Sequence, residues 1–255
     1  MVDANVKILK YLKEKGANLS ISNKYKCTLI HEAARNGAFE VLRYLVEDCK
    51  MDVNVSDVNG NLPVHMISMR DYNIDIFKYL KDKGANLSIA NKAKCTLIHK
   101  AARNGAFEVL RYLVEDCKMD VNVSDVNENL PIHMISMSDY NIDIFKYLKD
   151  KGANLSLSNK YKCTLIHEAA RNGAFEVLRY LVEDCKMDVN VSDVNGNLPV
   201  HMISMRDYNI DIFKYLKDKG ANISISNKDK RTLIHEAARN GALDVLRYLV
   251  EDCKM

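Results

Sequence analysis

The feature that most limits how this chain can fold is a strict internal repeat. Its seven histidines follow one another at intervals of 34 residues: they are His31, His65, His99, His133, His167, His201 and His235. Near-identity recurs every 68 residues, since 28–95 and 96–163 differ at only seven positions. Two kinds of unit therefore alternate, one with TLIH around its histidine and one with LPVH or LPIH. Such a period is typical of solenoids, in which each unit contacts only its neighbours.

Each TLIH unit is expected to form two short helices and a turn. Thr28 is placed to cap a first, alanine-rich helix that ends at Gly37. A second helix follows over residues 38–49, and a polar stretch with the turn signal Asn59-Gly60 comes after it. The apolar residues of the second helix recur at helical spacing: they are Phe39, Leu42, Leu45, Val46 and Cys49.

The LPVH unit repeats this plan. Pro63 lies where the first turn of a helix tolerates proline, and Gly84 is placed to end the second helix. In that second helix, Ile74, Phe77 and Leu80 form one apolar stripe. One such helix could not bury its stripe alone, so stacked copies are needed to build a core.

These residues together resemble the ankyrin repeat. The matching positions of the TLIH unit are Thr28, His31, Ala33, Ala34, Gly37, Leu45, Asp52, Val53 and Asn54. Those of the LPVH unit are Pro63, His65, Leu80, Gly84 and Ala85. The resemblance covers the whole chain and implies an all-α solenoid of helix-turn-helix units with extended turn fingers. Lys26 stands where glycine is usual at a fingertip, so we expect a distorted turn there.

We expect one ankyrin-like solenoid over residues 1–255. Residues 1–27 align with the second half of an LPVH unit and are expected to form an N-terminal half-repeat. Seven repeats follow, of which the last lacks its finger: they are 28–61, 62–95, 96–129, 130–163, 164–197, 198–231 and 232–255.

Composition excludes several classes of protein. A net charge of +3 is too small to indicate binding to nucleic acid or to a membrane surface. The sequence has no apolar run of the roughly 18 residues that a membrane span needs, and its amphipathic N-terminus does not resemble a signal peptide. Seven cysteines, an odd number, indicate reduced thiols and an intracellular protein, in the cytoplasm by preference and otherwise in the nucleus.

The repetition also argues against catalysis and metal binding. Equivalent positions of stacked helices lie about 8–10 Å apart, whereas zinc needs nitrogen ligands about 2 Å away. Histidines in register therefore cannot share one ion, and the resemblance implies instead that all seven are structural, tying the turn to the first helix. The sequence has no CxxC, P-loop, HExxH or GxSxG motif, and each carboxylate has copies elsewhere. We expect no enzyme, cofactor, metal or small-molecule substrate.

The function that remains is binding to another protein. The resemblance implies that such binding uses the fingers and the exposed, concave face of the first helices. At the fingertips we single out Lys24, Tyr25, Lys92, Lys160, Tyr161 and Lys228. At the end of the first helices we single out Arg35, Arg70, Arg103, Arg171, Arg206 and Arg239, with Ser138 as the exception. An acidic partner would complement this surface. The alternative is a solvated, charge-balanced face, because Asp57, Asp125 and Asp193 dilute the positive charge.

The two ends keep apolar residues that interior repeats would cover. At the first end these are Val6, Ile8 and Leu9, and at the last Leu243, Leu246 and Leu249. The chain is then either a piece of a longer array or able to associate end to end. The function we expect is a protein-binding scaffold. Two alternatives stay open: a structural or elastic spacer in a longer array, and an engineered repeat protein.

Overall fold

The computed structural model describes residues 4–67, 74–135, 142–203 and 210–255. Within these ranges it contains fifteen helices. Those of the first half are α1 (Ala4–Glu14), α2 (Leu29–Arg35), α3 (Phe39–Glu47), α4 (Pro63–Ile67), α5 (Ile74–Asp82), α6 (Leu97–Asn104) and α7 (Phe107–Glu115). Those of the second half are α8 (Pro131–Ile135), α9 (Ile142–Asp150), α10 (Leu165–Asn172), α11 (Phe175–Glu183), α12 (Pro199–Ile203), α13 (Ile210–Asp218), α14 (Leu233–Asn240) and α15 (Leu243–Glu251).

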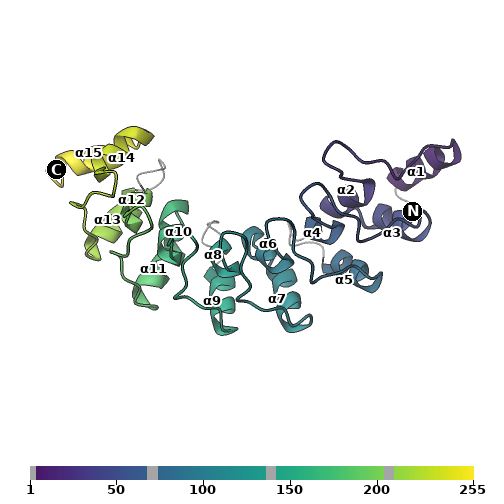
Figure 1. The fold of residues 1–255 in the computed structure, drawn as a ribbon, viewed down its shortest axis with the longest axis horizontal. Coiled ribbons are helices and arrows are strands. Elements are labelled where there is room, and N and C mark those ends of the chain that lie inside the picture. Colours follow the sequence, from purple (N-terminus) through teal and green to yellow (C-terminus); the bar gives the residue numbers. More distant parts are fainter. Residues whose placement is uncertain (1–3, 68–73, 136–141, 204–209) are drawn as a thin grey trace. The chain divides into compact units, whose positions relative to one another are not determined.

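The helices belong to two compact units, Met1–Asp120 and Val121–Met255. In the second unit the first helices of successive repeats pack in sequence, α8 against α10, α10 against α12 and α12 against α14. The second helices form another layer, with α9 against α11 and α13 against α15 (Figure 1). The first unit has the same two layers, since α4 contacts both α2 and α6 while α5 contacts α7. The predicted all-α repeat fold is confirmed.

The helices begin and end where the sequence predicts. Thr96 and His99 form a capping box at the start of α6, which satisfies backbone groups that the helix leaves open. The same helix ends at Gly105, whose φ of 71° lies in the left-handed region that glycine adopts without a steric penalty. In the described ranges, no helix is long and apolar enough to cross a membrane.

The buried stripe of the second helices differs from the predicted one by part of a turn. In α3 the buried residues are Val41, Leu42, Tyr44 and Leu45, whereas Phe39, Val46 and Cys49 are only partly covered. Leu42 and Leu45 of the predicted stripe are fully buried. The helix also touches the next second helix, where the ring centroids of Phe39 and Tyr79 lie 5.2 Å apart edge to face.

The LPVH units show the same shift. Phe77 and Leu80 are fully buried as predicted, but Ile76 takes the place expected for Ile74, which is partly exposed. Phe77, Phe145 and Phe213 are the largest fully buried side chains of these repeats. Their rings lie edge to face against a tyrosine of the next second helix, as Phe77 does against Tyr112 at 5.8 Å between ring centroids, and so pack successive second helices together.

Candidate partner-binding surface

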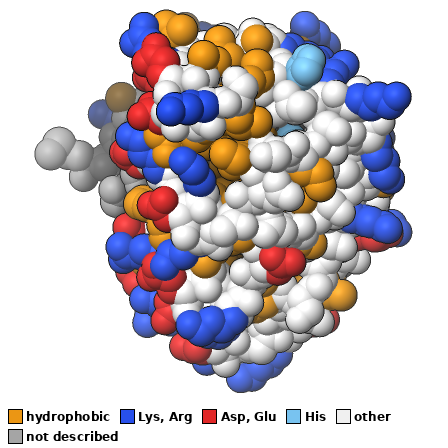
Figure 2. All heavy atoms as spheres, turned by 90° about the vertical axis from the view of Figure 1, so that its left-hand side faces the viewer, with side chains coloured by type: hydrophobic (Ala, Val, Ile, Leu, Met, Phe, Trp, Pro, Cys, Tyr) orange, Lys and Arg blue, Asp and Glu red, His pale blue; other side chains and the backbone are white. Residues whose placement is uncertain are grey.

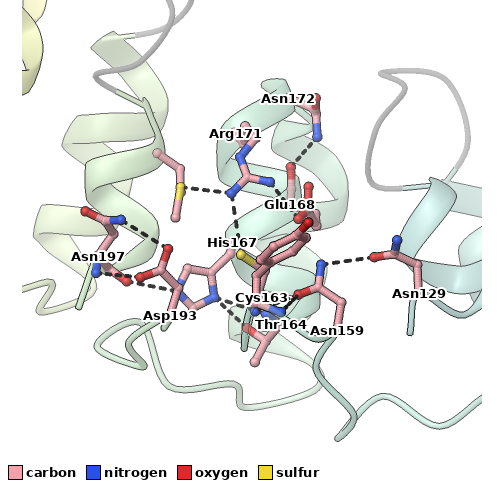
Figure 3. A network of polar contacts seen from close by, with 12 residues as sticks. Asn129, Asn159, Cys163, Thr164, His167, Glu168, Arg171, Asn172, Asp193 and Asn197 are labelled. Atoms are coloured by element: carbon pink, nitrogen blue, oxygen red, sulfur yellow. Dashed lines mark hydrogen bonds and ion pairs between the residues drawn. The ribbon is translucent and has the colours of Figure 1, made fainter. Parts of the chain in front are cut away.

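His31 and His167 each join their own first helix to the following finger. The backbone N–H of Thr164 donates to Nδ1 of His167 over 3.2 Å, and Nε2 lies 3.1 Å from the carbonyl oxygen of Asn197 (Figure 3). A ring nitrogen that faces an N–H must accept, and one that faces a carbonyl must donate. The proton therefore lies on Nε2. His31 makes the equivalent two bonds, at 3.2 and 3.1 Å.

The LPVH histidines are held in the same way. Nδ1 of His65 accepts from the N–H of Leu62 at 3.0 Å, and Nε2 lies 3.1 Å from the carbonyl of Ile89. His133 repeats the second contact with the carbonyl of Leu157, at 3.2 Å. Both imidazoles are fully buried. These bonds support the structural role that the resemblance implies for the histidines.

Burial keeps these imidazoles neutral. Loss of solvent lowers the pKa of His31, His167 and His201 below the ordinary 6.5. For His65, burial and then repulsion by Lys100 together lower the pKa to about 4. Among the described residues, no group of three or more His, Cys, Asp or Glu side chains could hold a metal ion. None of the seven cysteines, all of which lie in the described ranges, forms a disulfide.

The fingers are hairpin turns built on one acidic or amide side chain. Asp193 Oδ1 accepts from the backbone N–H of Asn195 and of Asn197, both at 2.8 Å. In the TLIH units the amide oxygen of Asn159 replaces the carboxylate and accepts from the N–H of Tyr161 and of Cys163. These bonds close the turn around one side chain, which is why Asn or Asp starts every finger.

Neighbouring fingers are also bonded to one another. Nδ2 of Asn159 donates to Oδ1 of Asn129 at 3.0 Å (Figure 3), and the backbone N–H of Lys160 donates to the carbonyl of Asn127 at 3.0 Å. In the first unit, Lys92 N–H donates to the carbonyl of Asn59 at 2.9 Å. Within each unit, each finger therefore holds the next in register.

The fingertips do not show the distortion that the sequence led us to expect. Lys26 has a φ of 59°, and its N–H donates to the carbonyl of Asn23 at 2.9 Å. Gly60 in the next finger has a φ of 77° and makes the same bond, to Asp57 at 3.0 Å. The prediction was wrong because lysine takes up the left-handed conformation instead of changing the turn, at a steric cost of about 1–2 kcal/mol.

The fingertip residues singled out from the sequence point outward. Lys24 Nζ lies 4.9 Å from the ring centroid of Tyr25, and Lys160 Nζ lies 5.0 Å from that of Tyr161. The tyrosines are 55% and 48% exposed. Lys92 is exposed as well, while Lys228 Nζ donates to the carbonyl of Val194 over 2.7 Å.

The arginines of the first helices do not form a uniform positive row. Arg171 Nη1 lies 2.7 Å from Oε1 of Glu168, which is only 2% exposed (Figure 3). Its Nη2 donates to the sulfurs of Cys163 and Met202, at 3.5 and 3.3 Å. The Glu-x-x-Arg spacing was a signal for this pair, because side chains three residues apart on a helix are neighbours.

Arg35 is held in the same way, with Nη1 at 2.7 Å from Oε1 of Glu32. Arg103 and Arg239 are exposed, and Lys100 takes the place of glutamate before Arg103. Three positions singled out from the sequence, Arg70, Ser138 and Arg206, lie outside the described residues.

Apolar side chains reach the surface at the two ends of the described chain. In α1, Ile8 and Leu12 are 56% and 40% exposed, and in α15, Leu243 and Val250 are 57% and 51% exposed. Figure 2 faces the C-terminal end and shows hydrophobic side chains among charged ones. Val6 and Leu249, two of the predicted end residues, are buried.

Comparison with known proteins identifies the repeats. A family model described as ankyrin repeats in three copies matches residues 49–125, 98–193 and 166–255, and a second, described as ankyrin repeats in many copies, matches residues 1–46. The human transient receptor potential cation channel subfamily A member 1 is 28% identical over 76% of this chain and 18% of its own length.

Two further relatives match with similar identity. Alpha-latroinsectotoxin-Lt1a of Latrodectus tredecimguttatus is 26% identical over 88% of this chain and 19% of its own length. The ankyrin repeat and KH domain-containing protein mask-1 of Caenorhabditis elegans is 26% identical over 97% of this chain and 9% of its own length. The chain therefore spans at most about a fifth of the length of the curated relatives it matches.

Proposed function

We propose that this chain, which belongs to the ankyrin repeat family, is a scaffold that binds another protein through its fingers and first helices. Ankyrin repeats generally mediate protein–protein interactions and are generally not enzymes. The partner we propose is a protein with an acidic segment. The relatives range from an ion channel to a latroinsectotoxin and a KH domain-containing protein, so the partner has to be inferred from the chemistry of this surface.

The observation that carries the proposal is the pairing of lysine with an exposed tyrosine at rigid fingertips. The Asn159 side chain closes its finger, and Asn159 and Lys160 are both bonded to the finger before. Tyr161 therefore loses little additional backbone freedom when a partner binds. Tyrosine and arginine are enriched at the centres of protein interfaces, where they bury a large area with few rotatable bonds.

The test uses a substitution that one repeat already contains. Ala93 occupies the fingertip position of Tyr25 and Tyr161, so changing both tyrosines to alanine should leave the fold intact. We expect residues 1–255 to capture one protein at defined stoichiometry from cells of the source organism, and the double variant to capture about tenfold less, a loss of about 1.4 kcal/mol.

A matched control changes Tyr11→Ala, an exposed tyrosine on α1 away from the fingers. Equal capture by all three proteins would show that the fingertips are not the binding surface. If no protein is captured at defined stoichiometry by the unchanged chain, the scaffold proposal is wrong and a spacer role is the better account.

A further inference from the structure

We infer that Lys100 and Arg103, three residues apart on α6, form a site for a carboxylate of the partner. This inference rests on the proposed scaffold function and names the part of the surface and the chemistry that the partner must supply. It starts from one position of the repeat at which the four TLIH copies carry Glu32, Lys100, Glu168 and Glu236.

Two of the other copies supply the carboxylate within the chain. Glu32 lies 2.7 Å from Arg35, and Glu168 lies 2.7 Å from Arg171, so the formal charges of each pair cancel. In the last copy Glu236 lies 3.6 Å from Arg231 instead. In α6 the same two positions are Lys100 and Arg103, so the summed formal charge of these two positions changes from zero to +2.

The surroundings of Lys100 strengthen this attraction. The side chain is half-buried, and its pKa is held below the ordinary 10.5 by burial and by the charge of Arg103, while Cys95 and Asp57 act in the opposite direction. A partly desolvated ammonium gains more from a carboxylate than a fully exposed one does.

The carboxylate that raises the pKa of Lys100, that of Asp57, is already engaged in hydrogen bonds. Asp57 accepts from the backbone N–H of Asn59 and of Asn61, both at 2.8 Å, and from Nδ2 of Asn61 at 2.9 Å. These bonds close its own finger and engage the Asp57 carboxylate there.

The chemistry of the two side chains favours a carboxylate. A guanidinium presents a planar fork that matches the two oxygens, and an ammonium adds a point charge beside it. Exposed Lys92 and Lys94, on the finger that precedes α6, extend the positive field. An acidic peptide segment, with one Glu or Asp side chain at the site and others along the finger, fits this arrangement.

The repeats also supply the decisive variants. Lys100→Glu gives α6 the sequence of α2 and α10, and it is expected to restore the ion pair seen there. Glu168→Lys makes the reciprocal change in α10, with a sequence that α6 already carries. Lys7→Glu, on an exposed position of α1, changes the net charge as much as Lys100→Glu does and controls for long-range electrostatics.

The experiment is a fluorescence-anisotropy titration of a labelled decaglutamate peptide at low ionic strength. We expect Lys100→Glu to weaken binding about tenfold, or about 1.4 kcal/mol, Lys7→Glu to weaken it less than twofold, and Glu168→Lys to strengthen it. The Lys100 side-chain NMR signals, assigned by their loss in Lys100→Glu, should shift when the peptide is added.

Three outcomes of this titration would overturn the inference. One is equal weakening by Lys100→Glu and Lys7→Glu, which would leave only general electrostatics, and another is no binding of the peptide to the unchanged chain. The third is equally strong, Lys100-dependent binding of an oligonucleotide of the same charge. If Lys100→Glu still captures the cellular partner as well as the unchanged chain, the scaffold proposal stands and this site is wrong.

Discussion

At the scale of single residues, the repeats show which positions are set by sterics. The fingertip conformation has positive φ in every described finger, whether the residue is Lys26, Gly60, Lys94 or Glu128. Lysine and glutamate there pay a steric cost that glycine avoids. The turn is fixed by the bonds of the Asn or Asp that starts each finger, so the fingertip residue adapts to it.

We predict that Glu128→Gly, which copies Gly60 and Gly196, raises the free energy of unfolding by up to about 1 kcal/mol. Glycine removes the steric cost of holding glutamate in the left-handed conformation. Part of this gain is lost because glycine has more conformational freedom in the unfolded chain. Denaturation by urea would measure it. The reverse change, Gly60→Glu, should destabilise, because a Cβ there lies 3.2 Å from the backbone nitrogen of Lys92. An unchanged or lower stability of Glu128→Gly would contradict this account.

Acid should destabilise the fold through the buried histidines. Their folded-state pKa lies below 6.5, and for His65 it is about 4. Between these values the unfolded chain binds protons that the folded chain does not, so stability is lost as pH falls from about 6.5 towards 4. His65 alone contributes roughly 3 kcal/mol over that window.

Urea unfolding at pH 7 and pH 5 would measure the effect above the range in which most carboxylates titrate. We expect a lower midpoint at pH 5 and an unchanged midpoint between pH 8 and pH 7. Equal midpoints at pH 7 and pH 5 would mean that the imidazoles are not held neutral.

At the scale of elements, the finger depends on its first side chain. We predict that Asp57→Ala lowers the free energy of unfolding by about 1–3 kcal/mol, because the buried backbone N–H of Asn61 and the part-buried N–H of Asn59 lose their acceptor. Asp57→Asn is the matched control, since Asn23, Asn91 and Asn159 hold the same turn through their amide oxygen. It should cost less than half as much. Amide hydrogen exchange of residues 57–61 would separate the two variants, and equal protection in both would contradict this role.

Sequence periodicity predicts the helices and fingers well because each is set locally, by Thr28 at a helix start or by Asp57 in a turn. The buried faces depend on neighbours. Phe39 belongs to the predicted apolar stripe, yet it is only partly covered and its ring contacts that of Tyr79 in the next second helix. The candidate site was less predictable for the same reason. Glu168 neutralises the charge of Arg171, and only the structure shows that the two side chains lie 2.7 Å apart.

At the scale of the whole molecule, stacked repeats stabilise their neighbours. We predict that Phe145→Ala, which empties a fully buried position of α9, costs about 3–5 kcal/mol. Because contacts join only adjacent repeats, hydrogen exchange should quicken most in α9 and in α11, which packs against it, and least in α15. Equal quickening in all three helices would show that the array unfolds as one unit.

The measurement that tests the central claim most directly is the side-chain nitrogen NMR spectrum of the histidines. Buried imidazoles join the first helices to the finger that follows, accepting at Nδ1 and donating from Nε2. His31, His65 and His167 make contacts on both sides of the ring, at 3.0 to 3.2 Å. All three should be neutral Nε2–H tautomers at pH 7.5, and His65, whose pKa is about 4, should remain one down to pH 5.5. Signals of a protonated ring, of the Nδ1–H tautomer or of a metal-bound nitrogen would contradict it.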